Sequence, residues 1–388
     1  MATSNNITVI DFTLSGIRLI YGYFFHGKVY VLQSLESSTL PLDENGYLSS
    51  KETTEVLNML LTTLKEQTES DVNTVIPLYP ANGFVVKQSS STVATIDQTS
   101  HILQMDFINC CSMINKENKD KTTKIIYNEP IRFYDDYRRE YVDFPLGIQS
   151  DHLSVSCYSH LINIDVYEHY RSILNSLNLN IYFELVSPVA ASMFINYFDA
   201  PNDYISLDLE KEYIYLSHIS NHHILDSKYI KYGLNHITQT FANKMGIQLD
   251  RAEELINLFG LNDDTPFKFQ TEDKFTVSDI NSNLSGSFKT LIDYLNNYIT
   301  TNNISADTPL ILYGLGGDIV SITTLLSQSL NRQVKLFSPT VIGARSKSFV
   351  SCLGAIRASE FKYQASLNET KKFENNINYT RGRFYRED

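Results

Sequence analysis

Two aspartates stand at matching places in the sequence, and both are suited to binding a metal ion. Asp11 and Asp208 each lie near the end of an apolar β-type run, and a turn follows each within a few residues. Carboxylates so placed can hold Mg²⁺ through water against the phosphates of a nucleotide, because Mg²⁺ keeps several waters and favours one or two carboxylates plus phosphate oxygens. The alternative is that each aspartate only caps its turn. The matching placement leaves both interpretations open.

A glycine-rich segment is the second candidate site. Gly314-Leu315-Gly316-Gly317-Asp318 follows the apolar run Pro309–Tyr313 and opens a predicted helix. Glycines let a ligand approach the backbone closely, and a helix N-terminus favours negative charge. The segment could therefore cradle a phosphate or receive an adenosine, with a tight strand-to-helix turn as the alternative. Its spacing does not match the dinucleotide-binding fingerprint.

Other kinds of catalytic or metal chemistry are not indicated. His222 and His223 fall in a β-type run, where neighbouring side chains point to opposite faces and cannot easily share a metal ion. The sequence contains neither a G-x-S-x-G elbow nor an H-E-x-x-H motif. The four cysteines show no C-x-x-C spacing, which argues against a zinc ribbon or a disulfide framework. They are Cys110, Cys111, Cys157 and Cys352.

The elements that must position these residues form two similar series. Each series predicts three short strands joined by tight turns, then helices and further strands. The strands of the first series are Ile7–Phe12, Ile17–Phe24, Val29–Gln33 and, after a helix, Val72–Tyr79. Those of the second are Tyr204–Leu209, Tyr213–Ile219, His223–Ile230 and, after helices that include a long one from Leu284 to Ile299, Pro309–Tyr313 and Val334–Phe337. The shared order predicts a duplicated α/β unit.

A different kind of segment separates the two series. Residues 84–165 are rich in Ser, Thr, Asn and Asp, and the stretch Lys116–Lys124 is highly charged. Within it, the alternation of Leu153–His160 predicts a half-buried strand. This part of the sequence therefore predicts an inserted small α+β domain.

Composition and charge narrow the possible functions. The chain has 388 residues, 43% of them hydrophobic, and a formal net charge of −12. This balance is typical of a globular protein, and so acidic a chain is not expected to bind nucleic acid. No apolar run reaches the roughly 18 residues of a membrane span, and no basic region of a secretory signal is found, so we expect a cytoplasmic protein. The basic and aromatic residues of 370–388 predict either contact with an anionic membrane surface or a solvated tail.

Several segments, taken in order, resemble FtsA, the family of bacterial actin-like cell-division proteins. Phe144-Pro145-Leu146-Gly147-Ile148, followed by Leu153-Ser154-Val155, is similar to the Pro-Leu-Gly-Met and Leu-x-Val of that family's inserted domain. Later family segments are resembled by Leu185–Ser192, Tyr232–Thr238, Ala252–Leu255 with Phe259-Gly260, Gly314–Asp318 and Ser351–Ile356. Together these segments extend over roughly residues 7 to 362, and their shared order is more specific than any one of them.

The resemblance implies an actin-like α/β fold with two lobes and an inserted domain. The first lobe would comprise 1–84 and 166–198, interrupted by the inserted domain at 85–165. The second lobe would comprise 199–235 and 305–344, with a helical subdomain at 236–304. A closing helix at 345–365 would return to the first lobe, and a flexible basic-aromatic tail would occupy 366–388.

The resemblance also implies a function. Members of the family bind ATP between the lobes, form head-to-tail filaments and recruit FtsZ to the membrane at the division site. The C-terminal tail of FtsZ would bind the helical subdomain. Carried onto this sequence, the magnesium ligands through water are Asp11 and Asp208, and the nucleotide-binding residues are Asp11, Thr13, Ser15, Asp208, Lys211, Gly233, Glu253, Gly314, Gly316 and Gly317.

Both phosphate loops depart from the family pattern. The family sequences are Asp-Ile-Gly-Thr-Ser-Lys and Asp-Ile-Gly-Gly-Gly-Thr, whereas 11–16 read Asp-Phe-Thr-Leu-Ser-Gly and 208–213 read Asp-Leu-Glu-Lys-Glu-Tyr. Loops without the family glycines approach phosphate less closely, and Glu210 or Glu212 would repel a triphosphate. Lys211 could compensate for lost backbone donors. We expect a degenerate nucleotide site that does not hydrolyse ATP, and whether it binds ATP and Mg²⁺ stays open.

Two other functions remain possible on the same fold. A small-molecule kinase would need intact phosphate loops and a positioned base, and the altered loops count against it. A pilus-assembly actin-like adaptor would share the fold and bind another partner. The leading interpretation is a division scaffold that self-associates and recruits FtsZ.

Overall fold

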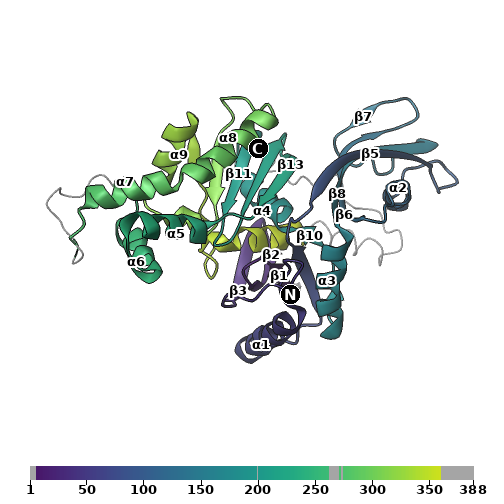
Figure 1. Cartoon of the computed structure of the whole chain (residues 1–388). Helices are drawn as coiled ribbons and strands as arrows, with labels where there is room; N and C mark the ends of the chain where they lie inside the picture. Colours follow the sequence, from purple (N-terminus) through teal and green to yellow (C-terminus); the bar gives the residue numbers. More distant parts are fainter. Residues whose placement is uncertain (1–5, 199, 262–270, 272–273, 360–388) are drawn as a thin grey trace. The chain divides into compact units, whose positions relative to one another are not determined.

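The computed structural model describes residues 6–198, 200–261, 271 and 274–359, and these form two compact units (Figure 1). The first unit comprises residues 1–199 together with 351–388, and the second comprises residues 200–350. The first unit is therefore built from two stretches of sequence that are far apart in the chain. The predicted tail at 366–388 lies outside the described residues.

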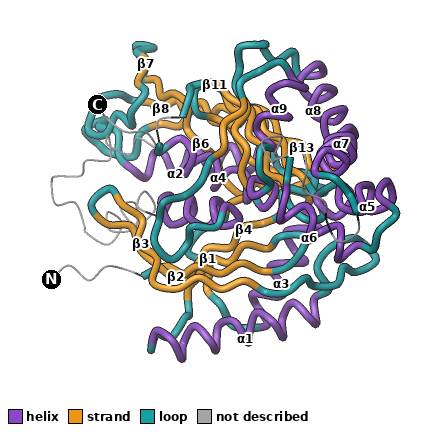
Figure 2. Tube along the Cα trace, turned by 90° about the vertical axis from the view of Figure 1, so that its left-hand side faces the viewer, coloured by secondary structure: helices purple, strands orange, loops and turns teal. Residues whose placement is uncertain are grey.

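A six-stranded mixed sheet forms the centre of the first unit. Its order is β10 (Leu185–Val186), β4 (Thr74–Tyr79), β1 (Ile7–Phe12), β2 (Ile17–Phe25) and β3 (Lys28–Glu36), with β9 (Asn180–Ile181) beside β4. Strands β1, β2 and β3 are antiparallel, whereas β4 is parallel to β1 and β10 is parallel to β4. The helices are α1 (Ser50–Thr68), which Figure 2 shows below the sheet, α3 (Ile164–Ser176) and α4 (Ser187–Asn196).

Helices α3 and α4 cover opposite faces of this sheet. The ring of Phe12 lies 4.8 Å from the ring of Tyr170 in α3, whereas Asp11 contacts Ser187 in α4. Neighbouring residues of a strand point to opposite faces, so these two contacts place one helix on each side.

Residues 350–359, which we call the closing helix, cover the same face as α4. A Cβ atom added to Gly22 of β2 would lie 3.2 Å from the Ile356 side chain, and one added to Gly354 would lie only 1.7 Å from the Ala190 carbonyl oxygen. The Arg357 guanidinium lies 4.6 Å from the ring centroid of Phe24. The closing helix thus packs against both β2 and α4.

A smaller sheet with its own core follows β4 in the chain. Its strands β5 (Val85–Ala94), β6 (Thr123–Tyr134), β7 (Glu140–Tyr141) and β8 (His152–Asn163) pair antiparallel in the order β5-β8-β6-β7. Helix α2 (Gln104–Glu117) packs on one face. The core beneath it consists of Ile102, Cys110, Ile114, Phe133, Phe144, Leu153, Val155 and Cys157. The segment is an α+β structure built around this separate hydrophobic core.

The second unit repeats the strand plan of the first. Its sheet has the order β13 (His223–Ile230), β12 (Ile214–Ser220), β11 (Asp203–Leu209), β14 (Leu310–Tyr313) and β15 (Val334–Leu336). The first three are antiparallel, and β14 is parallel to β11. Asp11 pairs with Leu78 of its parallel neighbour, and Asp208 pairs with Tyr313 of its own. The predicted duplicated α/β fold is confirmed.

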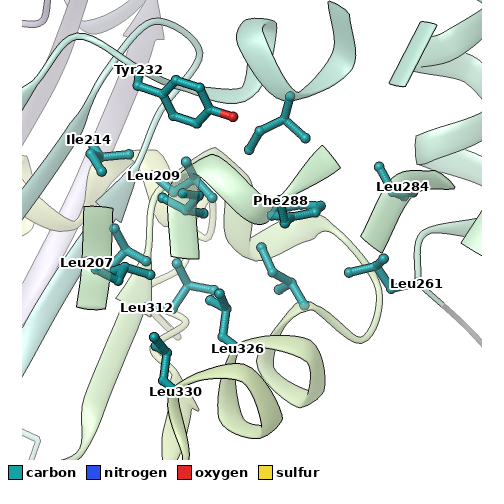
Figure 3. Packing of buried hydrophobic residues seen from close by; sticks show 14 of the residues in the cluster. Leu207, Leu209, Ile214, Tyr232, Leu261, Leu284, Phe288, Leu312, Leu326 and Leu330 are labelled. Atoms are coloured by element: carbon teal, nitrogen blue, oxygen red, sulfur yellow. The ribbon is translucent and has the colours of Figure 1, made fainter. Parts of the chain in front are cut away.

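In the part of the second unit that the structure describes, helices pack with this sheet around one apolar core (Figure 3). They are α5 (Leu234–Met245), α6 (Leu249–Phe259), α7 (Val277–Ser287), α8 (Lys289–Thr301) and α9 (Ile322–Leu330). The core includes Leu207, Leu209 and Leu312 from the strands with Phe288 and Leu326 from the helical part.

The predicted single helix from Leu284 to Ile299 is wrong. The structure has two helices that meet at Phe288, whose backbone N–H donates to Ser285 O at 3.2 Å. Ser285, Gly286 and Ser287 precede this break. Glycine and serine are weak helix formers, and serine hydroxyls compete for backbone groups. The apolar spacing continued across the break because both helices face the same core.

The prediction for the His222-His223 pair also needs correction. His222 has a positive φ of 67° and lies in the turn, and only His223 belongs to β13. The two rings are therefore not on opposite faces of one strand.

Candidate functional site

The loop that follows β1 is closed by its own hydrogen bonds. The Thr13 hydroxyl accepts from the backbone N–H groups of Ser15 at 3.2 Å and Gly16 at 3.0 Å, and Thr13 N–H donates to Gly16 O at 3.0 Å. Ser15 O accepts from Leu40 N–H at 2.9 Å, and Ile17 N–H donates to the Ser37 hydroxyl at 2.9 Å. These amides bind within the chain, so they are not presented to a phosphate group.

Asp11 is buried and its carboxylate is held in place. Asp11 is only 2% exposed. The Ser187 hydroxyl donates to Asp11 Oδ1 at 2.7 Å and also lies 3.2 Å from Tyr79 O. Ser187 is the first residue of α4, and Val186 occupies the cap position. Three neighbouring elements therefore meet at Asp11.

The loop that follows β11 caps a helix of its own unit. Glu210 N–H donates to Tyr213 O at 3.0 Å, which closes the turn. The carbonyl oxygens of Glu210 and Lys211 accept from the Leu234 and Asn235 N–H groups, each at 2.9 Å. These amides belong to the first turn of α5, where free N–H groups and the helix dipole would attract an anion. In this chain the loop carbonyls already satisfy them.

Two of the predicted glycines are required by contacts within the chain. A Cβ atom added to Gly233 would lie 2.4 Å from Glu210 O. One added to Gly314 would lie 2.3 Å from Asp208 Oδ1 and within 3.0 Å of the Leu209 backbone. Gly314 also has φ +80°, which favours glycine. The close approach that glycine permits here is made to the loop at 208–211.

The other two glycines are covered by side chains of the second unit. A Cβ atom on Gly316 would lie 2.2 Å from the Leu209 side chain, which is part of the apolar core (Figure 3). One on Gly317 would lie 2.7 Å from Lys347 Cδ. The Lys347 ammonium binds the Asp318 carboxylate. Gly314–Asp318 forms a short 3₁₀ turn rather than the start of an α-helix, so the prediction of a helix opening there is wrong.

The predicted site residues fall into separate groups. Asp11, Thr13 and Ser15 lie in the first unit, whereas the remaining ones lie in the second. Asp208, Lys211, Gly233 and Gly314 gather around the turn after β11. Glu253 lies exposed on α6, and the described contacts do not link it to that group. A magnesium ion shared by Asp11 and Asp208 stays a prediction.

Arg18 is not among the predicted site residues, yet it lies directly opposite Asp11 in the pairing of β1 with β2. It is only 4% exposed. Burial raises the pKa of the Cys352 thiol on the closing helix, Asp11 and Glu36 raise that pKa further, and Arg18 lowers it. The sequence did contain a signal for Arg18, namely a basic residue inside the apolar run Ile17–Phe25. Buried arginines are rare unless paired, so such a residue indicates a buried acidic partner.

The loops do not fit a triphosphate held by backbone amides. In both loops backbone N–H groups donate hydrogen bonds to acceptors of the same unit, and Glu210 places a buried carboxyl group beside the second loop. Among the described residues, no group of three or more His, Cys, Asp or Glu side chains could hold a metal ion.

Comparison with solved structures settles the fold. No protein-family model matches the sequence, and no curated protein matches it. The PilM–PilN type IV pilus biogenesis complex matches with a TM-score of 0.61 at 13% identity, covering 90% of this chain and 97% of the other. This is an actin-like fold.

Two further structures support the actin-like fold. The ethanolamine utilization protein EutJ from Carboxydothermus hydrogenoformans has a TM-score of 0.53 at 12% identity, covering 91% of this chain and 89% of its own. MreB5 of Spiroplasma citri, bound to ADP, also has a TM-score of 0.53 at 11% identity, covering 94% and 99%. Among the described residues, no helix of the actin-like fold combines the length and apolar character needed to cross a membrane.

Proposed function

We propose that this protein is an actin-like scaffold that binds a partner protein and associates with itself, and that it does not work by hydrolysing ATP. The observation that carries this proposal is the internal closure of both loops after β1 and β11. A phosphotransfer enzyme would need those amides and a positioned base for its transition state. The same closure argues against the small-molecule kinase alternative.

Nucleotide binding is the first property to measure. MreB5 holds ADP on a similar fold, but the loop closure supports weak binding or none in this chain. We expect Mg-ATP and Mg-ADP to leave the melting temperature unchanged at millimolar concentration, because a ligand stabilises only the state that binds it. Calorimetric titration gives the affinity directly.

The opposite outcome is ATP binding that depends on Lys211. Saturable binding at micromolar ATP, abolished by Lys211→Glu, would show that Lys211 replaces the missing backbone donors. Sedimentation of the same samples reports self-association separately, so the scaffold proposal and the nucleotide result can fail independently.

The leading partner is FtsZ, on the basis of the sequence resemblance. Its C-terminal tail would bind the helical subdomain at 236–304, of which the structure describes α5 to α8. The protein would then hold FtsZ at the division site, and the tail at 366–388 would add contact with an anionic membrane surface.

The second candidate is a pilus-assembly adaptor, which the similarity to the PilM–PilN complex favours. A pull-down of the full chain with an FtsZ C-terminal peptide and, in parallel, with a PilN-type protein distinguishes the two. Retention of the FtsZ peptide alone supports the division role, and retention of the PilN-type protein alone supports the pilus role. Retention of neither contradicts both partner assignments.

A further inference from the structure

A row of three charged residues crosses the antiparallel strands of the first unit. Asp11 in β1 lies opposite Arg18 in β2, and Arg18 lies opposite Glu36 in β3. Residues directly opposite each other in antiparallel strands have side chains on the same face. The order along the row is therefore acidic, basic, acidic, with the arginine in the middle.

Arg18 is bonded on its Glu36 side. Its Nε atom lies 2.9 Å from Glu36 Oε1, and the Glu36 side chain is 43% exposed. The Nε–H group is one of five donors on a guanidinium. Arg18 is only 4% exposed, and buried donors need acceptors, so the rest of the guanidinium must find acceptors inside the protein. The carboxylate that the register brings to its other side is Asp11.

Residues of the closing helix give a second, independent indication of where this row lies. Burial raises the pKa of the Cys352 thiol, Asp11 and Glu36 raise that pKa further and Arg18 lowers it, which is consistent with all three charges lying near this thiol. Ile356 lies one turn further along the helix, and its side chain lies beside Gly22 of β2. Successive residues of a strand alternate between faces, so Gly22 and Arg18 lie on the same face of β2. The helix therefore runs over Arg18 and encloses the row.

Asp11 is also enclosed on its β4 side, away from Arg18, by the first residue of α4. Ser187 donates a hydrogen bond to Oδ1 at 2.7 Å, and Asp11 is only 2% exposed. An ion of Mg²⁺ that keeps its water shell needs room and exposed carboxylate oxygens. The surroundings of Asp11 offer a hydroxyl and a buried arginine in place of that room.

We propose that Arg18 is the permanent counter-ion of Asp11, in place of the magnesium ion that the sequence predicts beside this carboxylate. The first unit then compensates the Asp11 charge with its own residues and needs no divalent cation. The proposal concerns this unit alone and does not depend on which partner the scaffold binds.

A double-mutant cycle on the full chain tests the pairing. Arg18→Met should lower the melting temperature by about 6–20 °C, because breaking a buried pair leaves an uncompensated charge. Asp11→Asn should also lower it, and combining the two should cost much less than the sum of the single changes. Glu36→Gln is the matched control: it removes the half-exposed partner of the same arginine and should shift the melting temperature by only a few degrees.

Two results would overturn the proposal. One is additivity of Arg18→Met and Asp11→Asn within a few degrees. The other is a rise in the wild-type melting temperature with millimolar Mg²⁺ alone that disappears in Asp11→Asn. Should Arg18→Met fail to fold, Arg18→Lys serves in its place, because it keeps the charge and should lose less stability than Asp11→Asn, and the Mg²⁺ measurement on the wild type still decides.

Discussion

Gly354→Ala is expected to be among the most damaging single substitutions in this chain. The added methyl carbon would lie 1.7 Å from the Ala190 carbonyl oxygen of α4, and 2.5 Å from its carbonyl carbon. Backbone atoms cannot rotate away as a flexible side chain can, so the closing helix must separate from α4. Overpacking typically costs about 1–3 kcal/mol, and overlap with backbone atoms places this substitution at the upper end, about 3 kcal/mol. Thermal unfolding should show a melting temperature lower by roughly 6–12 °C.

Gly286→Ala is the matched control for this prediction. It is the same substitution in another helix, and the added carbon would meet only the Lys244 ammonium at 2.7 Å, at the end of a flexible side chain. Because alanine is a better helix former than glycine by about 1 kcal/mol, Gly286→Ala should keep or slightly raise stability. Equal effects of the two substitutions would contradict the contact between the closing helix and α4.

Gly314→Ala should destabilise the second unit in the absence of any nucleotide. The substitution places a carbon 2.3 Å from Asp208 Oδ1 and within 3.0 Å of the Leu209 backbone, and the residue has φ 80° and ψ −178°. The conformation alone costs about 1–3 kcal/mol for a residue other than glycine, and the backbone overlap adds to it. Hydrogen exchange of β11 and β14 should increase, which locates the effect in this unit.

A second glycine with positive φ serves as the uncrowded control and tests the role of the loop. Gly246 has φ +69° in the same unit, and an added carbon there would meet nothing within 4 Å. Gly246→Ala should therefore cost only about 1 kcal/mol. If Gly314 were required only for ligand binding, Gly314→Ala without ligand would be as stable as Gly246→Ala. That outcome for Gly314→Ala would restore the nucleotide interpretation of Gly314–Asp318.

The strand plan of both units was predictable because it rests on local signals. Short apolar runs joined by tight turns identified β1 to β3 and β11 to β13, and their common order identified the duplication. The break at Phe288 was not predictable from apolar spacing, because α7 and α8 share one core face and keep the same periodicity across the break.

The site was predictable only in part. The positions of Asp11 and Asp208 at strand ends follow from the same runs. Whether a glycine faces a ligand or another part of the chain depends on contacts between distant residues, such as Gly317 with Lys347. Arg18 was missed for a similar reason: its partners are set by strand register and by a helix more than 300 residues later in the sequence.

The closing helix also sets the order in which this protein can mature on the ribosome. The surface of β2 that bears Phe24 is covered only after Ser351 and the residues that follow it have been synthesised. Synthesis of the intervening chain takes about 15–65 s at typical translation rates. Throughout that interval the part of this sheet face that the closing helix covers stays exposed. The second unit is contiguous in sequence, so it can reach its native state while the first is still waiting for its cover.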